Sequence, residues 1–268
     1  MKPNWKTFVD SVLAEDIGTG DLTSELTVPA DLRAGGTFFA RQDCVLAGSF
    51  LLPEMYESCE LLCADGDRLS DGAAVARVAG SARHLLSRER TALNLLQRLS
   101  GVATLARRYA DAVAGTKCRI LDTRKTTPGL RILEKMAAKA GGAVNHRMGL
   151  YDAVLIKNNH ITAAGGVANA LQAALGKHPV VEIEVRTWDE LNEALDHGAT
   201  RLLLDNLTPD QARRWIAHIG GRASVEISGG VTLDTVRAYA EAGADFVSVG
   251  AITHSAPAVD LNFRISLA

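Results

Sequence analysis

The second half of the chain alternates short apolar segments with helical ones, and this alternation constrains the fold more than any other feature. About seven apolar segments follow Gly115, each leading into a stretch with helical periodicity. They are CRILDT, AVNHR, AVLIK, VVEIEV, RLLLDN, SVEISGG and DFVSVGA. Helices are expected near residues 130–140, 167–175, 188–197, 209–219 and 233–242. Strand–helix alternation over about 150 residues predicts a parallel sheet, and this many units predict a seven-stranded α/β barrel.

The first part of the chain has a different pattern, in which strands and helices are grouped. We expect an amphipathic helix over 4–15 and a long helix over 84–113, in which Gly101 predicts a bend. Strands are expected near 36–41, 45–48 and 73–79, with a helix over 50–62. Such grouping predicts an α+β domain. We therefore place one domain at 1–113 and the barrel at 114–255, with the tail 256–268 as a candidate to pack on the first domain.

Composition excludes several classes of function. A length of 268 residues with 47% hydrophobic content supports a large core, and the net charge of -2 gives no global attraction to nucleic acid or to an anionic membrane. No signal peptide and no run of about 18 apolar residues is visible, so we expect a cytoplasmic protein. The four cysteines form no CxxC pair, which predicts reduced, structural thiols and no zinc site.

Charged residues and glycines follow the apolar segments at the carboxyl ends of the predicted strands, where barrel enzymes place their chemistry. The first three ends are basic, the next two acidic, and the last two rich in glycine. In chain order the residues are Thr123, Arg124, Lys125, His146, Arg147, Lys157, Glu184, Asp205, Ser228, Gly229, Gly230, Gly250 and Ala251. Cations and bare backbone N–H groups bind carboxylates and phosphates, while acids bind a divalent metal. A phosphoribosyl donor fits this pattern.

Alternation within the strands supports this placement. Glu182 and Glu184 share one face of VVEIEV, and Glu226 and Ser228 share one face of SVEISGG. These side chains are expected to point into the barrel if the aliphatic residues between them meet the helices. A buried carboxylate needs a metal or a cationic partner, and the basic residues supply one.

Each of these residues also has an ordinary structural interpretation. A single Arg or Lys is usually a solvated surface charge, and His146 could be a hydrogen-bonded core histidine. Asp205 could cap the following helix, and the glycine pair after Ser228 could be an ordinary turn. Arg90 stands beside Glu89 in a helical stretch, where a surface ion pair explains it equally well. Only the joint position at successive strand ends favours function.

Seven motifs extend the pattern over nearly the whole chain. They are EDIGTGDLT, RERTALNLLQRLSGVAT, ILDTRKTTPGLR, NHRMGLYDAVLIKNNH, LLLDN, EISGG and SVGAITHS. In this order they resemble the quinolinate phosphoribosyltransferase family, also called nicotinate-nucleotide pyrophosphorylase (carboxylating). The resemblance implies an N-terminal α/β sandwich domain before a seven-stranded α/β barrel. It also implies transfer of phosphoribose from phosphoribosyl pyrophosphate to quinolinate, with loss of carbon dioxide, in the synthesis of NAD.

The resemblance assigns roles to particular residues. Arg124, Lys125, His146, Arg147 and Lys157 would bind quinolinate carboxylates or donor phosphates, and Glu184 and Asp205 would face the ribose and the pyrophosphate. Substrate-bound Mg²⁺ would contact Asp205 and Glu184, directly or through water. Ser228, Gly229, Gly230, Val249, Gly250 and Ala251 would hold the ribose phosphate, with Thr123 also in the substrate-binding set. The expected catalytic residues are Lys125, Lys157, Glu184 and Asp205. Arg90 would complete the site of a second subunit in a homodimer or a higher even oligomer.

Two positions depart from the family pattern, and three other functions stay open. Asn158 stands where the family usually has Asp, and Ala143 where it usually has a third Gly. One rival is a paralogous phosphoribosyltransferase-like protein that acts on another anionic base, such as nicotinate. Another is a barrel that binds phosphorylated metabolites without catalysis. An aldolase with a Schiff base on Lys157 is the third.

Overall fold

A computed structural model describes residues 4–267 of the chain. The residues group into two compact units, one formed by Met1–Leu105 with Ala256–Ala268 and the other by Ala106–Ser255. The division falls inside the long helix α3 (Ala82–Ala112) rather than at its end. Among the described residues, no helix combines the length and the apolar character that crossing a membrane requires.

The first unit is built on an antiparallel sheet with strand order β12-β1-β5-β3. Strand β12 returns from the far end of the chain to pair with β1, so that Phe263 lies opposite Phe38. Phe38 is fully buried, as are Leu85, Leu96 and Leu99 of α3. The elements are α1 (Trp5–Ile17), α2 (Leu22–Thr27), β1 (Arg33–Ala40), β2 (Cys44–Val45), η1 (Ser49–Glu54), β3 (Ser58–Leu61), β4 (Arg68–Leu69), β5 (Ala74–Ser81), α3 and β12 (Leu261–Leu267).

The helix predicted over 50–62 is wrong. This segment forms the short 3₁₀ helix η1 and then strand β3, which pairs with β5. Pro53 lies inside η1 and lacks the N–H that a continuing helix needs. The carboxylate of Asp65 accepts hydrogen bonds from the backbone N–H groups of Gly48 and Ser49 (2.8 and 2.9 Å), which fixes the start of the turn. Leu51 and Leu52 are buried, as they would be in a longer helix, so the apolar pattern alone could not separate the two.

Gly101 lies at a close contact within the continuous helix α3, and the bend predicted there stays a prediction. Helix α3 runs through it without interruption from Ala82 to Ala112. A Cβ at Gly101 would lie 2.1 Å from the carbonyl oxygen of Pro257, so only glycine leaves room for the chain that leads into β12.

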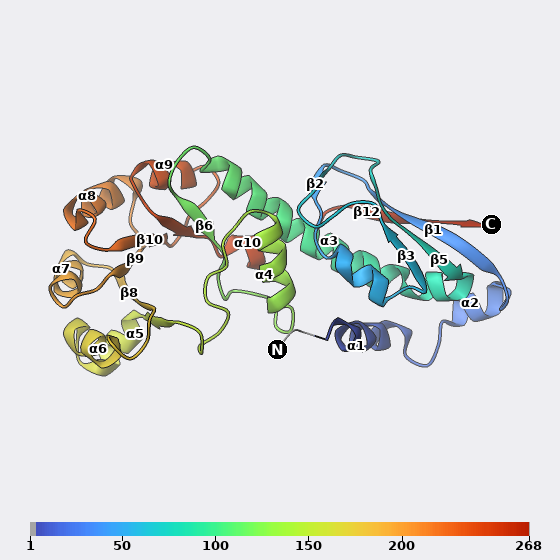
Figure 1. Cartoon of the computed structure of the whole chain (residues 1–268), viewed down its shortest axis with the longest axis horizontal. Coiled ribbons are helices and arrows are strands. Elements are labelled where there is room, and N and C mark those ends of the chain that lie inside the picture. The colour runs from blue at the N-terminus through green and yellow to red at the C-terminus, as the bar shows by residue number, and fades with distance from the viewer. Residues whose placement is uncertain (1–3, 268) are drawn as a thin grey trace. The chain divides into compact units, whose positions relative to one another are not determined.

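The second unit is the predicted parallel sheet surrounded by helices. Its strand order is β6-β11-β10-β9-β8-β7, and all neighbours run parallel. Figure 1 shows helices α6 to α9 around the outside of these strands. The elements are β6 (Arg119–Leu121), α4 (Arg131–Ala140), β7 (Val154–Ile156), α5 (Asn158–Ala164), α6 (Val167–Ala174), β8 (Val181–Val185), α7 (Trp188–Asp196), β9 (Arg201–Asp205), α8 (Pro209–Ile219), β10 (Ser224–Ser228), α9 (Val236–Glu241), β11 (Phe246–Ser248) and α10 (Ala251–His254).

The second of the seven predicted strands, AVNHR, is reduced to a single parallel bridge between Val144 and Leu121. Side chains take over the hydrogen bonds that a longer strand would form. The carboxylate of Asp122 accepts the backbone N–H of His146 (2.8 Å) and the side-chain amide of Asn145 (2.6 Å). The barrel therefore has six hydrogen-bonded strands and one bridge within the part of the chain that the structure describes.

A buried ion pair between Lys135 of α4 and Asp122 supports the same segment. Both side chains are fully buried. The Lys135 ammonium also donates to the carbonyl oxygen of His146 (3.0 Å). Burial raises the pKa of Asp122, while hydrogen bonds from Lys135, Asn145 and His146 act against this rise. The Asp122 carboxylate thus binds the backbone N–H of His146, and the Lys135 ammonium binds its backbone C=O.

Candidate active site

A cavity of about 640 Å³ opens at the carboxyl ends of the barrel strands. This volume suits a substrate of small-molecule size. Every site residue predicted in the barrel lines it, namely Thr123, Arg124, Lys125, His146, Arg147, Lys157, Glu184, Asp205, Ser228, Gly229, Gly230, Val249, Gly250 and Ala251. The strand-end pattern therefore predicts one convergent cavity correctly.

Arg90 is the predicted site residue that the structure does not bring to this cavity. It lies on α3 in the first unit, and its side chain is exposed. Its role stays a prediction.

Strand register brings the acidic residues and the glycine turns together. Asp205 ends β9 and pairs with Ser228, which ends β10. Glu184 pairs with Leu203 one strand away, inside a strand β8 that is buried along its whole length. Parallel strands of a barrel are packed on both faces, so a polar residue there faces the interior. This agrees with the inward direction expected for Glu184.

The basic sector consists of Arg124, Lys125, Arg147 and Lys157, and its charges are incompletely compensated. Burial lowers the pKa of Arg147, and the neighbouring Arg124 lowers it further. The Nε of Arg124 is buried without a hydrogen-bond partner among the described residues. A bound anion would supply the missing acceptor and relieve the repulsion.

The acidic sector consists of Glu184 and Asp205. Neither forms an ion pair within residues 4–267. One carboxylate oxygen of Asp205 accepts a hydrogen bond from the Asn206 amide (2.7 Å), which orients the group. Two carboxylates at one cavity offer the oxygen ligands that Mg²⁺ prefers, so the donor chemistry fits this ion.

Two glycine turns let backbone approach the cavity closely. Gly229 and Gly230 both have positive φ (90° and 61°), and a Cβ on Gly229 would lie 2.3 Å from the side-chain oxygen of Asn206. Asn206 itself has a φ of 57°, and its N–H donates to the carbonyl of Ser228 (2.9 Å). A Cβ on Gly250 would lie 2.8 Å from the Lys125 side chain. Larger residues would fill the space that a phosphate needs.

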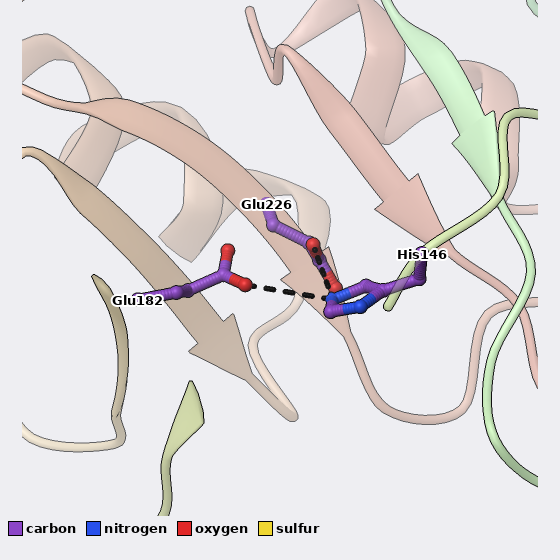
Figure 2. A group of neighbouring side chains, drawn as sticks. All are labelled: His146, Glu182 and Glu226. Carbon is purple, nitrogen blue, oxygen red and sulfur yellow. Dashed lines mark ion pairs between the residues drawn. The ribbon is translucent and has the colours of Figure 1, made fainter. Parts of the chain in front are cut away.

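Three side chains form a buried group, which we call the acid cluster: Glu182, Glu226 and His146. Figure 2 shows the two carboxylates, from β8 and β10, converging on one nitrogen of the imidazole ring. Each lies 3.4 Å from Nε2 of His146. Glu226 and His146 line the cavity, and the Oε1 of Glu226 has no hydrogen-bond partner among the described residues.

The hydrogen bonds of the acid cluster decide where its protons lie. Nδ1 of His146 accepts the backbone N–H of Arg147 (2.7 Å), which assigns the ring proton to Nε2. Burial lowers the pKa of His146, but Glu182 and Glu226 outweigh this and raise it to about 9. A cationic ring would point a second proton at the Arg147 N–H. We therefore place an added proton on the two carboxylates, while the neutral ring keeps its own proton on Nε2. This agrees with the pKa of Glu226, which burial and Glu182 raise.

The spacing of the acid cluster would also suit a metal. The three ligand atoms lie within 4.8 Å of one another. A metal ion would bind His146 through an Nε2 that carries no proton. Because Nδ1 accepts the Arg147 N–H, however, the ring proton stays on Nε2. We therefore treat the cluster as hydrogen-bonded, with a net negative charge when the two carboxylates share one added proton.

Several cavity residues were not assigned from the sequence. They are Leu155, Leu203, Asn206, Glu226, Val231, Thr232, Ser248 and His254. Strand alternation predicts that Glu226 points into the barrel but indicates no role for it. Thr232 and His254 follow the glycine turns by two to four positions, which no strand-end rule covers.

Comparisons with known proteins agree with this geometry. The family model described as "Quinolinate phosphoribosyl transferase, C-terminal domain" matches residues 102–264, and its N-terminal counterpart matches residues 21–100. A Bacillus subtilis protein named probable nicotinate-nucleotide pyrophosphorylase [carboxylating] is 38% identical and covers 98% of this chain and 93% of its own length. A chloroplastic Arabidopsis thaliana protein of the same activity name is 39% identical, with 97% and 82% covered.

A solved structure agrees as well. The nicotinate-nucleotide pyrophosphorylase of Francisella tularensis superposes with a TM-score of 0.93 at 36% identity, covering 99% of this chain and 98% of that one. Sequence and structure are thus matched over both units. The chain belongs to the quinolinate phosphoribosyl transferase family.

Proposed function

We propose that the chain transfers phosphoribose from phosphoribosyl pyrophosphate to the ring nitrogen of quinolinate and releases pyrophosphate and carbon dioxide. The product would be nicotinate mononucleotide, a precursor of NAD. The observation that carries this proposal is the convergence of four cations, two carboxylates and two glycine turns on one cavity. Each part matches one charged part of the two substrates.

The cations favour a dicarboxylate over a monocarboxylate. Arg124, Arg147 and Lys157 present guanidinium and ammonium groups that bind carboxylates through charge-assisted hydrogen bonds. A ligand with one carboxylate would leave some of these cations unpaired in a partly buried site, which is costly. Quinolinate supplies two adjacent carboxylates, so its affinity should exceed that of nicotinate.

The glycine turns, Lys125 and the acidic sector suit phosphoribosyl pyrophosphate, the donor of the phosphoribosyl group. The backbone at Ser228, Gly229, Gly230 and Gly250 can approach the ribose phosphate, and Lys125 would neutralise the pyrophosphate. Asp205 and Glu184 would hold substrate-bound Mg²⁺ directly or through water, or accept from ribose hydroxyls. The ion, when bound, stabilises negative charge on the leaving pyrophosphate.

The chemistry requires no nucleophile from the protein. The ring nitrogen attacks the anomeric carbon, a nitrogen–carbon bond forms, and the bond to pyrophosphate breaks with its electron pair leaving on oxygen. The ring is then cationic, so it can take the electrons released when the adjacent carboxylate leaves as carbon dioxide. The ring carbon accepts a proton from solvent. The protein contributes orientation and electrostatic stabilisation through Lys125, Lys157, Glu184 and Asp205.

We further propose a homodimer or a higher even oligomer in the cytoplasm, in which Arg90 of one subunit completes the site of another. The exposed position of Arg90 on α3 leaves its guanidinium available to a second chain. The four cysteines are unpaired, as is usual in a reducing compartment.

Release of carbon dioxide from carboxyl-labelled quinolinate tests the proposed function. We expect release only when phosphoribosyl pyrophosphate and Mg²⁺ are both present, with equal amounts of nicotinate mononucleotide. Nicotinate and nicotinamide, assayed in parallel, should give little product. Faster reaction with nicotinate would favour a related enzyme for a different base, and binding without turnover would favour a sensor.

A further inference from the structure

We propose that the acid cluster stabilises the positive charge that the pyridine ring and the anomeric carbon acquire as the new bond forms. This inference rests on the proposed function. It assigns a role in the reaction to Glu182 and Glu226, with His146 as the positioning residue between them.

The first support is the position of the acid cluster within a site for anions. Arg124, Lys125, Arg147 and Lys157 attract the negative substrates to the same cavity that Glu226 and His146 line. Glu226 lines that cavity, and Glu182 lies on the other side of His146, in a second cavity of about 180 Å³ that His146 and Glu226 also line. A carboxylate at the substrate cavity acts against the binding of any anion. A group that weakens ground-state binding contributes to catalysis only if it stabilises the transition state more. The charge that develops there must then be positive.

The second support is the state of the hydrogen bonds. Nε2 of His146 lies 3.4 Å from one oxygen of each carboxylate, and the Glu226 Oε1 is buried without a hydrogen-bond partner among residues 4–267. The negative charge of the acid cluster is therefore only partly compensated by contacts among the described residues. Glu182 is 9% exposed and Glu226 3%, so little water screens this charge.

The third support is the rigid hold on His146. Its ring accepts from the Arg147 N–H, its backbone N–H donates to Asp122, and its carbonyl accepts from Lys135. Both ring nitrogens are occupied inside the protein, so the ring has no free N–H for a substrate carboxylate. His146 instead fixes where the two carboxylates lie relative to the cavity. Fixed charges aimed at developing charge are the strongest electrostatic contribution to catalysis.

The proposed step is balanced. In the substrate the ring nitrogen is neutral, and after attack it carries a formal positive charge while pyrophosphate leaves with the electron pair. Loss of carbon dioxide leaves its electron pair on the ring carbon, which takes a proton from solvent, so the ring nitrogen keeps its positive charge until the product leaves. The acid cluster would lower the energy of the cationic species without gaining or losing a proton.

A matched pair of ligands tests this inference directly. Quinolinate has a neutral ring, whereas N-methylated quinolinate carries the same two carboxylates on a cationic ring. Calorimetry would give the Kd of each ligand for the wild type and for the double variant Glu182→Gln/Glu226→Gln. We expect the double variant to bind the cationic ligand at least roughly tenfold more weakly, and quinolinate unchanged or more tightly. Its kcat should fall while the KM for quinolinate does not rise.

The controls separate this role from a merely structural one. Glu241→Gln removes an exposed carboxylate of the barrel that is paired with Arg237, and it should change neither Kd. If the double variant melts far below the wild type, the single variants carry the test, with a smaller selective loss expected. If the double variant bound both ligands equally more weakly, or if neither Kd changed, the inference would be overturned. Absence of carbon dioxide release by the wild type would instead refute the proposed function, while quinolinate binding would still test the cluster.

Discussion

Lys157 directly follows β7, and its exposed side chain lines the cavity, so the proposed function assigns its charge to the ligand. We predict that Lys157→Ala lowers kcat/KM for quinolinate by roughly 10- to 150-fold, which corresponds to one charge-assisted hydrogen bond of about 1.5–3 kcal/mol. The melting temperature should stay close to that of the wild type. Steady-state kinetics and thermal melting measure the two effects. Lys177→Ala, at an exposed position away from the cavity, is the matched control. Wild-type kinetics in Lys157→Ala would remove this residue from the site.

The sequence predicts residues well where chemistry and strand geometry coincide. A charged residue near the carboxyl end of an apolar barrel strand lies at the face where the active site forms. For this reason Arg124, Arg147 and Asp205 all line the cavity. The sequence predicts less well where a role depends on a partner distant in the chain. His146 was assigned to substrate from resemblance, whereas its ring nitrogens contact Arg147, Glu182 and Glu226. No spacing rule joins residues 146, 182 and 226.

The segment that carries His146 and Arg147 depends on side chains because it pairs with β6 through only one bridge. We predict that Lys135→Met destabilises the protein by about 3–5 kcal/mol, since the Asp122 carboxylate would stay buried without its cation. Unfolding by urea, monitored by circular dichroism, measures the change. Quinolinate binding should weaken as well, because the carbonyl of His146 loses its donor.

A double variant provides the control for this prediction. Asp122→Asn with Lys135→Met removes both charges and keeps an acceptor for the His146 N–H. It should recover part of the lost stability. If Lys135→Met alone stayed within about 1 kcal/mol of the wild type, the ion pair would not be what holds this segment.

Elements were predicted reliably where one period dominates a long segment. α3, α4 and α6 to α9 fall in this class, since their apolar residues repeat with helical spacing, whereas the sequence predicts none of the short helices α2, α5 and α10. The segment 50–62 was misassigned because a short buried 3₁₀ helix and an adjoining strand share the apolar content of one longer helix. At Gly101 the sequence predicts a bend, which stays a prediction, but it does not predict the close contact that this residue makes. Its small size serves a contact with Pro257, which lies more than a hundred residues further along the chain.

The order of the strands along the chain explains how the whole molecule is assembled. The barrel unit is continuous in sequence, whereas the first unit is completed only when β12 pairs with β1. A continuous α/β unit can be predicted from local alternation. The return of the last strand depends on pairing across more than two hundred residues, and the sequence alone only suggested that the tail could pack there.

Sharing of active sites between subunits is the proposal that concerns the whole molecule, and it makes a quantitative prediction. Arg90→Ala and Lys157→Ala alone should each keep roughly a tenth of the wild-type activity or less if Arg90 acts on the site of another subunit. After exchange at equal concentrations, half of the dimers are mixed, and each mixed dimer has one site with both side chains intact. Activity should therefore recover to about a quarter of the wild-type value. The assay is carbon dioxide release after mixing, with subunit exchange demonstrated by native mass spectrometry of one labelled variant. If Arg90 acted within its own subunit, every site would lack one of the two residues. Exchange without recovery of activity would then place Arg90 outside a shared site.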